Sequence, residues 1–182
     1  MVQQSGATVG DAIVLTKPIG TGVLLAAEMH QSADGDDYTA ALTSMLRSQA
    51  KASQYLATAA TAMTDVTGFG LAGHLLNILK ASGVSARLSG SAIPVLEGAW
   101  ALAEAGMRST LWASNMAISD QVSMPEGPLR DLLFDPQTCG GLLATIPAAQ
   151  VDDLLRNFED DNEPIWRVGT IEAGPAHINV ID

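Results

Sequence analysis

The chain has 182 residues, enough for one compact domain or at most two small ones whose core can fold unaided. Hydrophobic residues make up 47% of it and aromatic residues only 4%, so the core must be built mainly from Ala, Leu, Val, Ile and Met. The formal net charge of −11 repels phosphate backbones and anionic lipids, which argues against partners such as nucleic acid or a membrane surface. A bound nucleotide would therefore need help from metal ions.

The single cysteine excludes an intramolecular disulfide. The sequence shows neither a signal-peptide pattern nor an apolar run near ~18 residues, so we expect a cytoplasmic protein. Residues 1–10, MVQQSGATVG, are expected to be a disordered lead-in, and residues 11–182 a single domain.

Apolar periodicity and turn residues define the elements of the first half. In chain order they predict a strand over 11–17, a helix over 23–30, a long helix over 38–60 and a helix over 71–81. Asp36 or Asp37 is expected to cap the long helix, and Gly83 to end the last one in a left-handed conformation.

The second half continues the same mixture. It is predicted to contain a strand over 84–88, a helix over 94–105, a long surface loop over 107–128, a strand over 142–146, a helix over 148–158, and strands over 166–171 and 177–181. The whole pattern predicts an α+β fold in which a mixed β-sheet is covered by α-helices on one or both faces.

The turn Thr64–Gly70, with the sequence TDVTGFG, is the strongest candidate site. It places the Asp65 carboxylate just before a glycine turn around Gly68, whose backbone N–H groups and following helix start can face a phosphate. A carboxylate and a phosphate could share one Mg²⁺ ion there, because Mg²⁺ takes one or two protein oxygens and fills its other positions with water and phosphate. The alternative is that Asp65 merely caps the helix.

A second candidate is the turn Lys17–Gly22, KPIGTG, at the end of the first strand. Lys17 offers a cation and Thr21 a hydroxyl next to flexible glycines, which is a combination also used to bind phosphate. The GxxxxGK[ST] order of a P-loop is absent, so the turn could equally be a solvated corner.

The third polar turn is Asp135–Gly141, DPQTCGG. Cys139 could act as a nucleophile if a neighbour lowered its pKa, but no basic residue lies near it in sequence, and a small packed thiol is the favoured interpretation. His74 is interpreted as a hydrogen-bonded structural side chain, because His30 and His177 share no metal-ligand spacing with it.

These three turns, in this order, resemble the C-terminal half of selenophosphate synthetase, also called selenide, water dikinase, within the wider group similar to aminoimidazole ribonucleotide synthetase. The matching segments are LTKPIGTG at 15–22, TDVTGFGL at 64–71 followed by GHL at 73–75, and DPQT at 135–138 followed by GGLL at 140–143. Cys139 departs from the pattern, since the family commonly has Ser there.

The resemblance implies a Mg²⁺-dependent phosphotransferase that converts ATP, selenide and water to selenophosphate, AMP and phosphate, and that is homodimeric at full length. It implies that Asp65 is the aspartate that the C-terminal half contributes to the magnesium cluster. The catalytic Cys or selenocysteine, its neighbouring Lys and most metal-binding aspartates belong to an N-terminal ATP-binding domain, which we expect to be absent here. We therefore expect this chain to be inactive alone.

Two other hypotheses remain. The chain could belong to a related ATP-dependent enzyme with the same fold, acting in purine synthesis, on thiamine phosphate or in hydrogenase maturation. It could also be a non-catalytic, stand-alone domain that binds a partner or a nucleotide. A domain built to pack on a missing partner keeps an uncovered apolar face, so self-association through that face is a further hypothesis.

Overall fold

A computed structural model describes residues 3–182, which form seven strands and eight α-helices joined by turns and short 3₁₀ segments. The strands are β1 (Ala12–Leu15), β2 (Ala62–Asp65), β3 (Ser85–Ser89), β4 (Val122–Ser123), β5 (Leu142–Ile146), β6 (Trp166–Glu172) and β7 (Ile178–Ile181). The helices are α1 (Thr21–Met29), α2 (Gly35–Leu46), α3 (Ala50–Ala59), α4 (Gly70–Ser82), α5 (Ala99–Glu104), α6 (Trp112–Asn115), α7 (Pro128–Leu133) and α8 (Val151–Asp160). The 3₁₀ segments are η1 (Gly90–Ala92), η2 (Met116–Gln121) and η3 (Ala148–Gln150).

All seven strands form one sheet in the order β2-β5-β1-β6-β3-β7-β4. Neighbours are antiparallel from β2 to β3, whereas β3, β7 and β4 run parallel to one another. The prediction of a mixed sheet is confirmed. Strand β2 lies at one edge, so the turn that follows it leaves from the border of the sheet.

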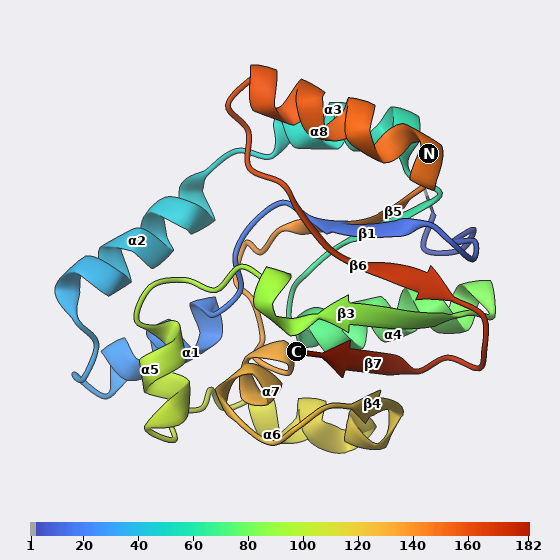
Figure 1. The fold of residues 1–182 in the computed structure, drawn as a ribbon. Coiled ribbons are helices and arrows are strands. Elements are labelled where there is room, and N and C mark those ends of the chain that lie inside the picture. The colour runs from blue at the N-terminus through green and yellow to red at the C-terminus, as the bar shows by residue number, and fades with distance from the viewer. Residues whose placement is uncertain (1–2) are drawn as a thin grey trace.

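Helices cover both faces of the sheet (Figure 1). The alternation along β1 shows why: Ala12 and Val14 pack into a core with α3 and α8, whereas Ile13 and Leu15 pack into the larger core with α1, α4, α5 and α7. All four side chains are buried. A strand buried on both faces needs no polar alternation, which explains its continuous apolar run.

The predicted helix over 38–60 is wrong, because the chain breaks at Arg47–Gln49 into α2 and α3. At the break the Gln49 side chain turns inward, where its Oε1 accepts a hydrogen bond from the Leu142 N–H (3.2 Å) and its Nε2 donates to the Gly140 carbonyl (2.9 Å). The cap of α2 also differs from the prediction. Asp34, rather than Asp36 or Asp37, accepts from the first backbone N–H groups of α2.

Two predictions in the middle of the chain are also corrected. The helix expected over 94–105 is only α5, because the segment before it is extended and pairs with Ile19 through Pro94 and Leu96. The loop expected over 107–128 contains α6, η2 and the short strand β4, and α7 follows it. These elements are too short to show a period in the sequence.

Residues 3–10 are not the disordered lead-in that composition suggested; Met1 and Val2 lie outside the described residues. The Gln3 carbonyl accepts a hydrogen bond from the Met63 N–H (2.9 Å), and the Ser82 hydroxyl accepts from the Ala7 N–H (3.2 Å). Ala7 is buried in the larger core. This segment therefore packs alongside β2 and the end of α4.

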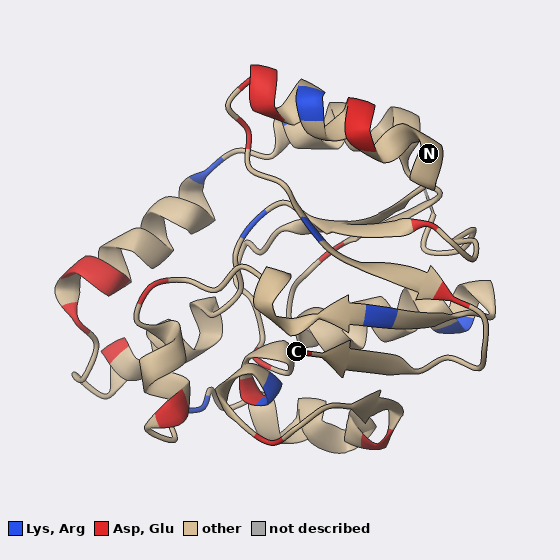
Figure 2. Ribbon diagram, viewed as in Figure 1, with Lys and Arg blue, Asp and Glu red and all other residues tan. Residues whose placement is uncertain are grey.

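The 20 acidic residues outnumber the nine basic ones and are spread over many elements of the fold (Figure 2). Two of them lie in the first turn of α2 and two in the first turn of α8, where carboxylates interact favourably with the positive end of the helix dipole. The few basic residues are separated from one another along the ribbon. Across residues 3–182, no helix is long and apolar enough to cross a lipid bilayer.

Candidate functional site

The three predicted turns, far apart in sequence, meet at one end of the sheet. The second turn (64–70) and third turn (135–141) are joined by two backbone hydrogen bonds, from Val66 N–H to the Gly141 carbonyl (2.8 Å) and from Gln137 N–H to the Thr67 carbonyl (2.9 Å). The first turn (17–22) joins the third through the side chain of Gln137, whose Oε1 accepts from the Gly20 N–H (2.9 Å). These hydrogen bonds join the three turns into a single structural unit.

Glycine is required where the turns touch. A Cβ on Gly22 would collide with the Pro136 carbonyl oxygen, and a Cβ on Gly140 with the Val66 carbonyl oxygen. Neither backbone oxygen can move without shifting its turn. These glycines therefore permit the turns to approach each other, rather than providing flexibility.

The start of α1 is occupied by the third turn. The Asp135 carboxylate accepts from the Val23 N–H (3.1 Å), while the side-chain Oε1 of Gln137 accepts from both the N–H and the hydroxyl of Thr21 (3.1 and 3.0 Å). The Thr21 hydroxyl in turn accepts from the Thr138 N–H (2.9 Å). Thr21 is buried and its hydroxyl makes two hydrogen bonds within the turns, so it holds the turns together, and its contact with phosphate stays a prediction.

Asp135 is the most perturbed acid of the site. Burial raises the pKa of its carboxyl to about 7, against the opposing effect of hydrogen bonds from the Val23 N–H and the Gln137 side chain to Oδ2. Its Oδ1 is buried without a hydrogen-bond partner among residues 3–182, as is the hydroxyl of Ser109. A carboxyl group with such a pKa is partly protonated at neutral pH.

A hollow of about 280 Å³, which we call the three-turn cleft, opens where the turns meet. Its lining includes Gly22 from the first turn, Gly68 from the second and Pro136–Thr138 from the third. A Cβ on Gly68 would meet no atom within 4 Å, so this side of the second turn is open. That Gly68 binds phosphate stays a prediction, and its backbone is open to the cleft.

The remaining wall of the three-turn cleft comes from α1 and from residues 108–111, which were not predicted as site residues. Arg108 is the cation on this wall. Its guanidinium donates to the Ala103 carbonyl (2.7 Å), pairs with Asp131 and lies 5.3 Å from the centre of the Trp112 ring. A lone arginine in a segment without periodicity carries no sequence signal, although its contacts fix it firmly.

Lys17 lies apart from the three-turn cleft. Its ammonium group donates to the carbonyls of Cys139 (3.0 Å) and Met45 (3.4 Å), and the residue is almost fully buried. Burial lowers the pKa of Lys17. Lys17 borders a broader hollow of about 930 Å³ against α2, so any phosphate bound by this residue would approach from the α2 side.

Asp65 ends β2 and is exposed. The alternative role of capping α4 is wrong, because Phe69 occupies the cap position and no side chain caps that end of the helix. The structure gives Asp65 no side-chain hydrogen bond or ion pair with any of residues 3–182. Its carboxylate is therefore available, although Asp65 does not line the three-turn cleft itself.

The interpretations of His74 and Cys139 have opposite outcomes. His74 is buried, its Nε2 accepts from the Thr67 N–H (3.0 Å), and burial lowers its pKa, as expected of a structural histidine. Cys139, expected to be packed, is exposed, and its backbone adopts a positive φ of 50°. The structure also places the Lys17 ammonium on the Cys139 carbonyl, a neighbour that sequence distance concealed.

Solved structures share this architecture at low sequence identity. Thiamine-monophosphate kinase from Stenotrophomonas maltophilia K279a matches with a TM-score of 0.71 and 21% identity over 98% of this chain and 52% of its own. The hydrogenase maturation protein HypE from E. coli matches with a TM-score of 0.67 and 14% identity over 100% of this chain and 49% of its own. The fold is thus the one that forms about half of each of these proteins.

The chain belongs to the family described as AIR synthase related protein, C-terminal domain, whose model matches residues 8–181. Curated relatives are more similar in sequence. Selenide, water dikinase from Burkholderia pseudomallei (strain K96243) is 35% identical over 98% of this chain, and that from Myxococcus xanthus (strain DK1622) is 35% identical over 100% of it. The chain spans 52% and 53% of those relatives, about half of their length.

Proposed function

We propose that this chain acts as the C-terminal domain of a selenide, water dikinase. Together with an N-terminal ATP-binding domain, it would convert ATP, selenide and water to selenophosphate, AMP and phosphate. The single observation that carries the proposal is the uncommitted, exposed Asp65 carboxylate in the second turn, whose residue Gly68 borders the three-turn cleft. The similarity to curated selenide, water dikinases over nearly the whole chain supports the choice of reaction.

Asp65 fits the role of a magnesium ligand. Its carboxylate oxygens are the hard donors that Mg²⁺ prefers, and no hydrogen bond within residues 3–182 competes for them. Within these residues, no group of three or more His, Cys, Asp or Glu is placed to hold a metal ion. We therefore propose that Asp65 supplies one ligand and that a second domain supplies the others; when bound, Mg²⁺ would neutralise charge on the transferred phosphoryl group.

In this proposal the rest of the site has a positioning role. Gln137 and Thr21 lock the first and third turns together, and Val66 ties the second turn to them, so the carboxylate of Asp65 leaves a rigid support. Phosphoryl transfer depends largely on such positioning of charges. The ATP-dependent part rests on the relatives and on a solved structure of the same fold described as AaThiL complexed with AMPPCP and TMP.

A related ATP-dependent enzyme of the same fold is the second candidate. The solved structures of thiamine-monophosphate kinase and HypE favour it, but their identities to this chain are 21% and 14%, against 35% for the selenide, water dikinases. We further propose that the two-domain protein is a cytoplasmic homodimer.

The decisive experiment measures AMP formation from ATP with and without selenide, using this chain alone and this chain joined to the N-terminal domain of a curated relative. We expect no turnover by the chain alone and selenide-dependent AMP formation by the joined protein. Asp65→Asn should reduce that activity by about 100-fold or more, because the amide is a weaker metal ligand. Asp36→Asn, an equal charge change on α2, should leave it intact.

A second measurement separates the metal role from catalysis. Mn²⁺, used as a paramagnetic substitute for Mg²⁺, should broaden the amide NMR signals of residues 64–68 in the chain alone, and D65N should abolish the effect. Selenide-independent AMP formation, full activity of the D65N protein, or broadening confined to other acidic residues would each refute the proposed role.

A further inference from the structure

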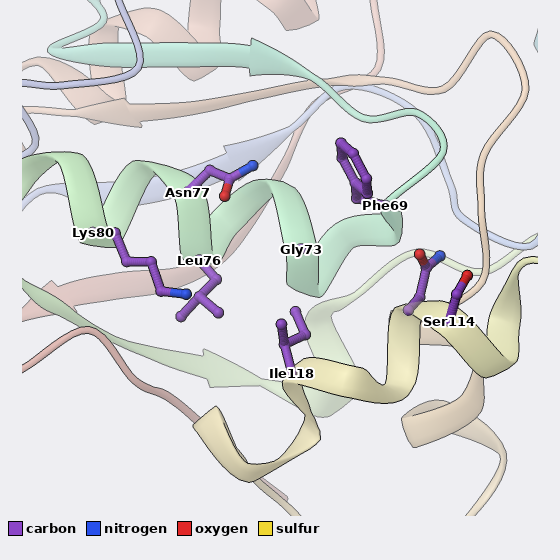
Figure 3. Close-up of a pocket in the computed structure, with 8 residues that line it drawn as sticks. Phe69, Gly73, Leu76, Asn77, Lys80, Ser114 and Ile118 are labelled. Carbon is purple, nitrogen blue, oxygen red and sulfur yellow. The ribbon is translucent and has the colours of Figure 1, made fainter.

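A second hollow, of about 340 Å³, lies between α4 and the segment formed by α6 and η2 (Figure 3). It is lined by Phe69, Gly73, Leu76, Asn77 and Lys80 on one side and by Ser114, Asn115 and Ile118 on the other. Its volume lies at the low end of the range for small-molecule pockets. None of the proposed functional residues in the three turns lines it, so it is a separate feature of the molecule.

Asn115 is a polar residue that lines this hollow and has only 9% of its surface exposed. Its Nδ2 donates to the carbonyls of Gly68 (2.8 Å) and Phe134 (2.9 Å). Two carbonyl acceptors assign this atom as the nitrogen, so Oδ1 points away from both of them. No described residue donates to Oδ1, and it is not sealed beneath other atoms, so it can accept a hydrogen bond where Asn115 lines the hollow.

Phe69 forms one wall of the hollow, and 61% of its surface is exposed. Such exposure of an aromatic ring is costly unless something covers it. Next to Phe69 on α4 lies Gly73, where a Cβ would lie 2.7 Å from the Cβ of Phe69. The absence of a side chain at Gly73 thus leaves this stretch of α4 open to the hollow that Phe69 and Ile118 line.

Lys80 lies at the other end of the hollow. It is about 16 Å from Phe69 along the helix, at ~1.5 Å per residue. In Figure 3 its side chain runs along the groove towards Leu76. No described carboxylate forms an ion pair with Lys80, and α4 itself carries no acidic residue. Because the chain has a net charge of −11, an anion has few sites to bind, and the ammonium group of Lys80, unpaired within residues 3–182, is one of them.

We propose that this hollow binds a small anionic heteroaromatic molecule of the nucleoside monophosphate type. Its planar ring stacks on Phe69, an amino group of the ring donates to Asn115 Oδ1, and its single anionic group lies near Lys80. The apolar floor formed by Leu76 and Ile118 excludes water from the middle of the ligand. This site is independent of magnesium and of the proposed reaction.

Cytidine 5′-monophosphate is a suitable probe, because it carries all three features but no adenine that could report on an ATP site. Titration of the chain, followed by amide NMR shifts, should move signals within residues 69–80 and 114–118. Cytidine without phosphate should bind more weakly. Inorganic phosphate alone should leave these signals in place, because it lacks the ring.

Two surface variants locate the ligand. Phe69→Ala should weaken binding about tenfold, the size expected for one base stacked on an aromatic ring. Lys80→Gln should remove the difference in affinity between cytidine 5′-monophosphate and cytidine. Lys51→Gln, the same charge change on α3 in the opposite helical layer, should change neither affinity. The NMR spectrum of each variant before titration checks that the fold is intact.

Several outcomes would overturn the proposal. They are the absence of shifts in residues 69–80 at millimolar ligand, shifts confined to the three turns, and binding that survives both Phe69→Ala and Lys80→Gln. Because none of these measurements uses ATP, selenide or Mg²⁺, failure here would leave the proposed function untouched, and failure of the proposed function would leave this site untouched.

Discussion

Asp135 combines burial, an unpaired oxygen and a structural task at the start of α1. Its carboxyl pKa of about 7 lies above the ordinary value of 3.8, which the unfolded chain would restore. Between these two values the unfolded chain releases the proton while the folded chain keeps it. The contribution of this group to stability therefore falls as pH rises from about 4 to about 7, and is constant above that.

We predict that Asp135→Asn removes this pH dependence. From about pH 5 to about pH 8 the original protein should lose roughly 2–3 kcal/mol of unfolding free energy relative to the variant, at ~1.4 kcal/mol per pH unit. Chemical denaturation at several pH values measures the difference. Asp160→Asn, on an exposed residue of α8, is the control and should leave the slope unchanged; equal slopes for the original protein and D135N would contradict the assigned pKa.

At the residue scale the sequence predicted the composition of the site better than its geometry. The turn pattern selected Asp65, whose side chain is exposed, and Gly68, which borders the three-turn cleft, but not the fact that Asp65 lies outside that cleft. It did not predict that Thr21 and Lys17 are buried, because their partners, Gln137 for Thr21 and the Cys139 carbonyl for Lys17, lie more than a hundred positions away. Arg108 was not predicted for the same reason, because the contacts that fix its side chain cannot be recognised from the residues next to it in the sequence.

Among the elements, the break between α2 and α3 is the clearest case of tertiary structure overriding helix propensity. Alanine, leucine and methionine continue the helical pattern across the break. The hydrogen bonds that the inward Gln49 side chain makes stabilise the protein more than a further helical turn would. Short elements such as α6 and β4 were missed because four residues or fewer show no period. Longer ones, α4 with its Gly83 cap above all, were predicted closely.

We predict that Gln49→Ala destabilises the protein by about 1–3 kcal/mol, because it leaves the Gly140 carbonyl without its partner and removes one of the two acceptors of the Leu142 N–H, the other being the Thr16 hydroxyl. Thermal and chemical denaturation measure the loss. The matched control is Gln54→Ala on the exposed face of α3, which should change stability by less than about 0.5 kcal/mol. A Q49A protein as stable as Q54A would show that the side chain does not hold the turn.

At the scale of the whole molecule, the sequence predicted the layered arrangement of helices on a sheet. The sequence predicted a mixed sheet covered by helices on one or both faces, and a hydrophobic core is found on each face. The strand order was not predictable, because it depends on pairings such as β1 with β6 that lie far apart in the chain. The expected uncovered apolar surface includes Met29, which is 80% exposed, and Leu111, both at the three-turn cleft.

We predict that the isolated chain self-associates weakly through the apolar surface that includes Met29 and Leu111, since apolar side chains exposed together favour contact between molecules. Light scattering over a range of concentrations should show a rising mean mass. The double variant Met29→Lys with Leu111→Lys should remain monomeric, whereas Leu46→Lys, on an equally exposed apolar residue of α2, should not. A monomer at every concentration would dismiss the idea.

The hydrogen bond between Gly20 and Gln137 spans 117 positions of the chain. Contacts of such long range form late, because the entropy of closing the intervening segment is lost before any compensating interaction appears. During synthesis, a nascent polypeptide that has not yet released its third turn from the ribosome would leave the beginning of α1 uncapped. Ligand competence should accordingly switch on as a late, cooperative event, so that partly made copies sequester neither metal nor nucleotide.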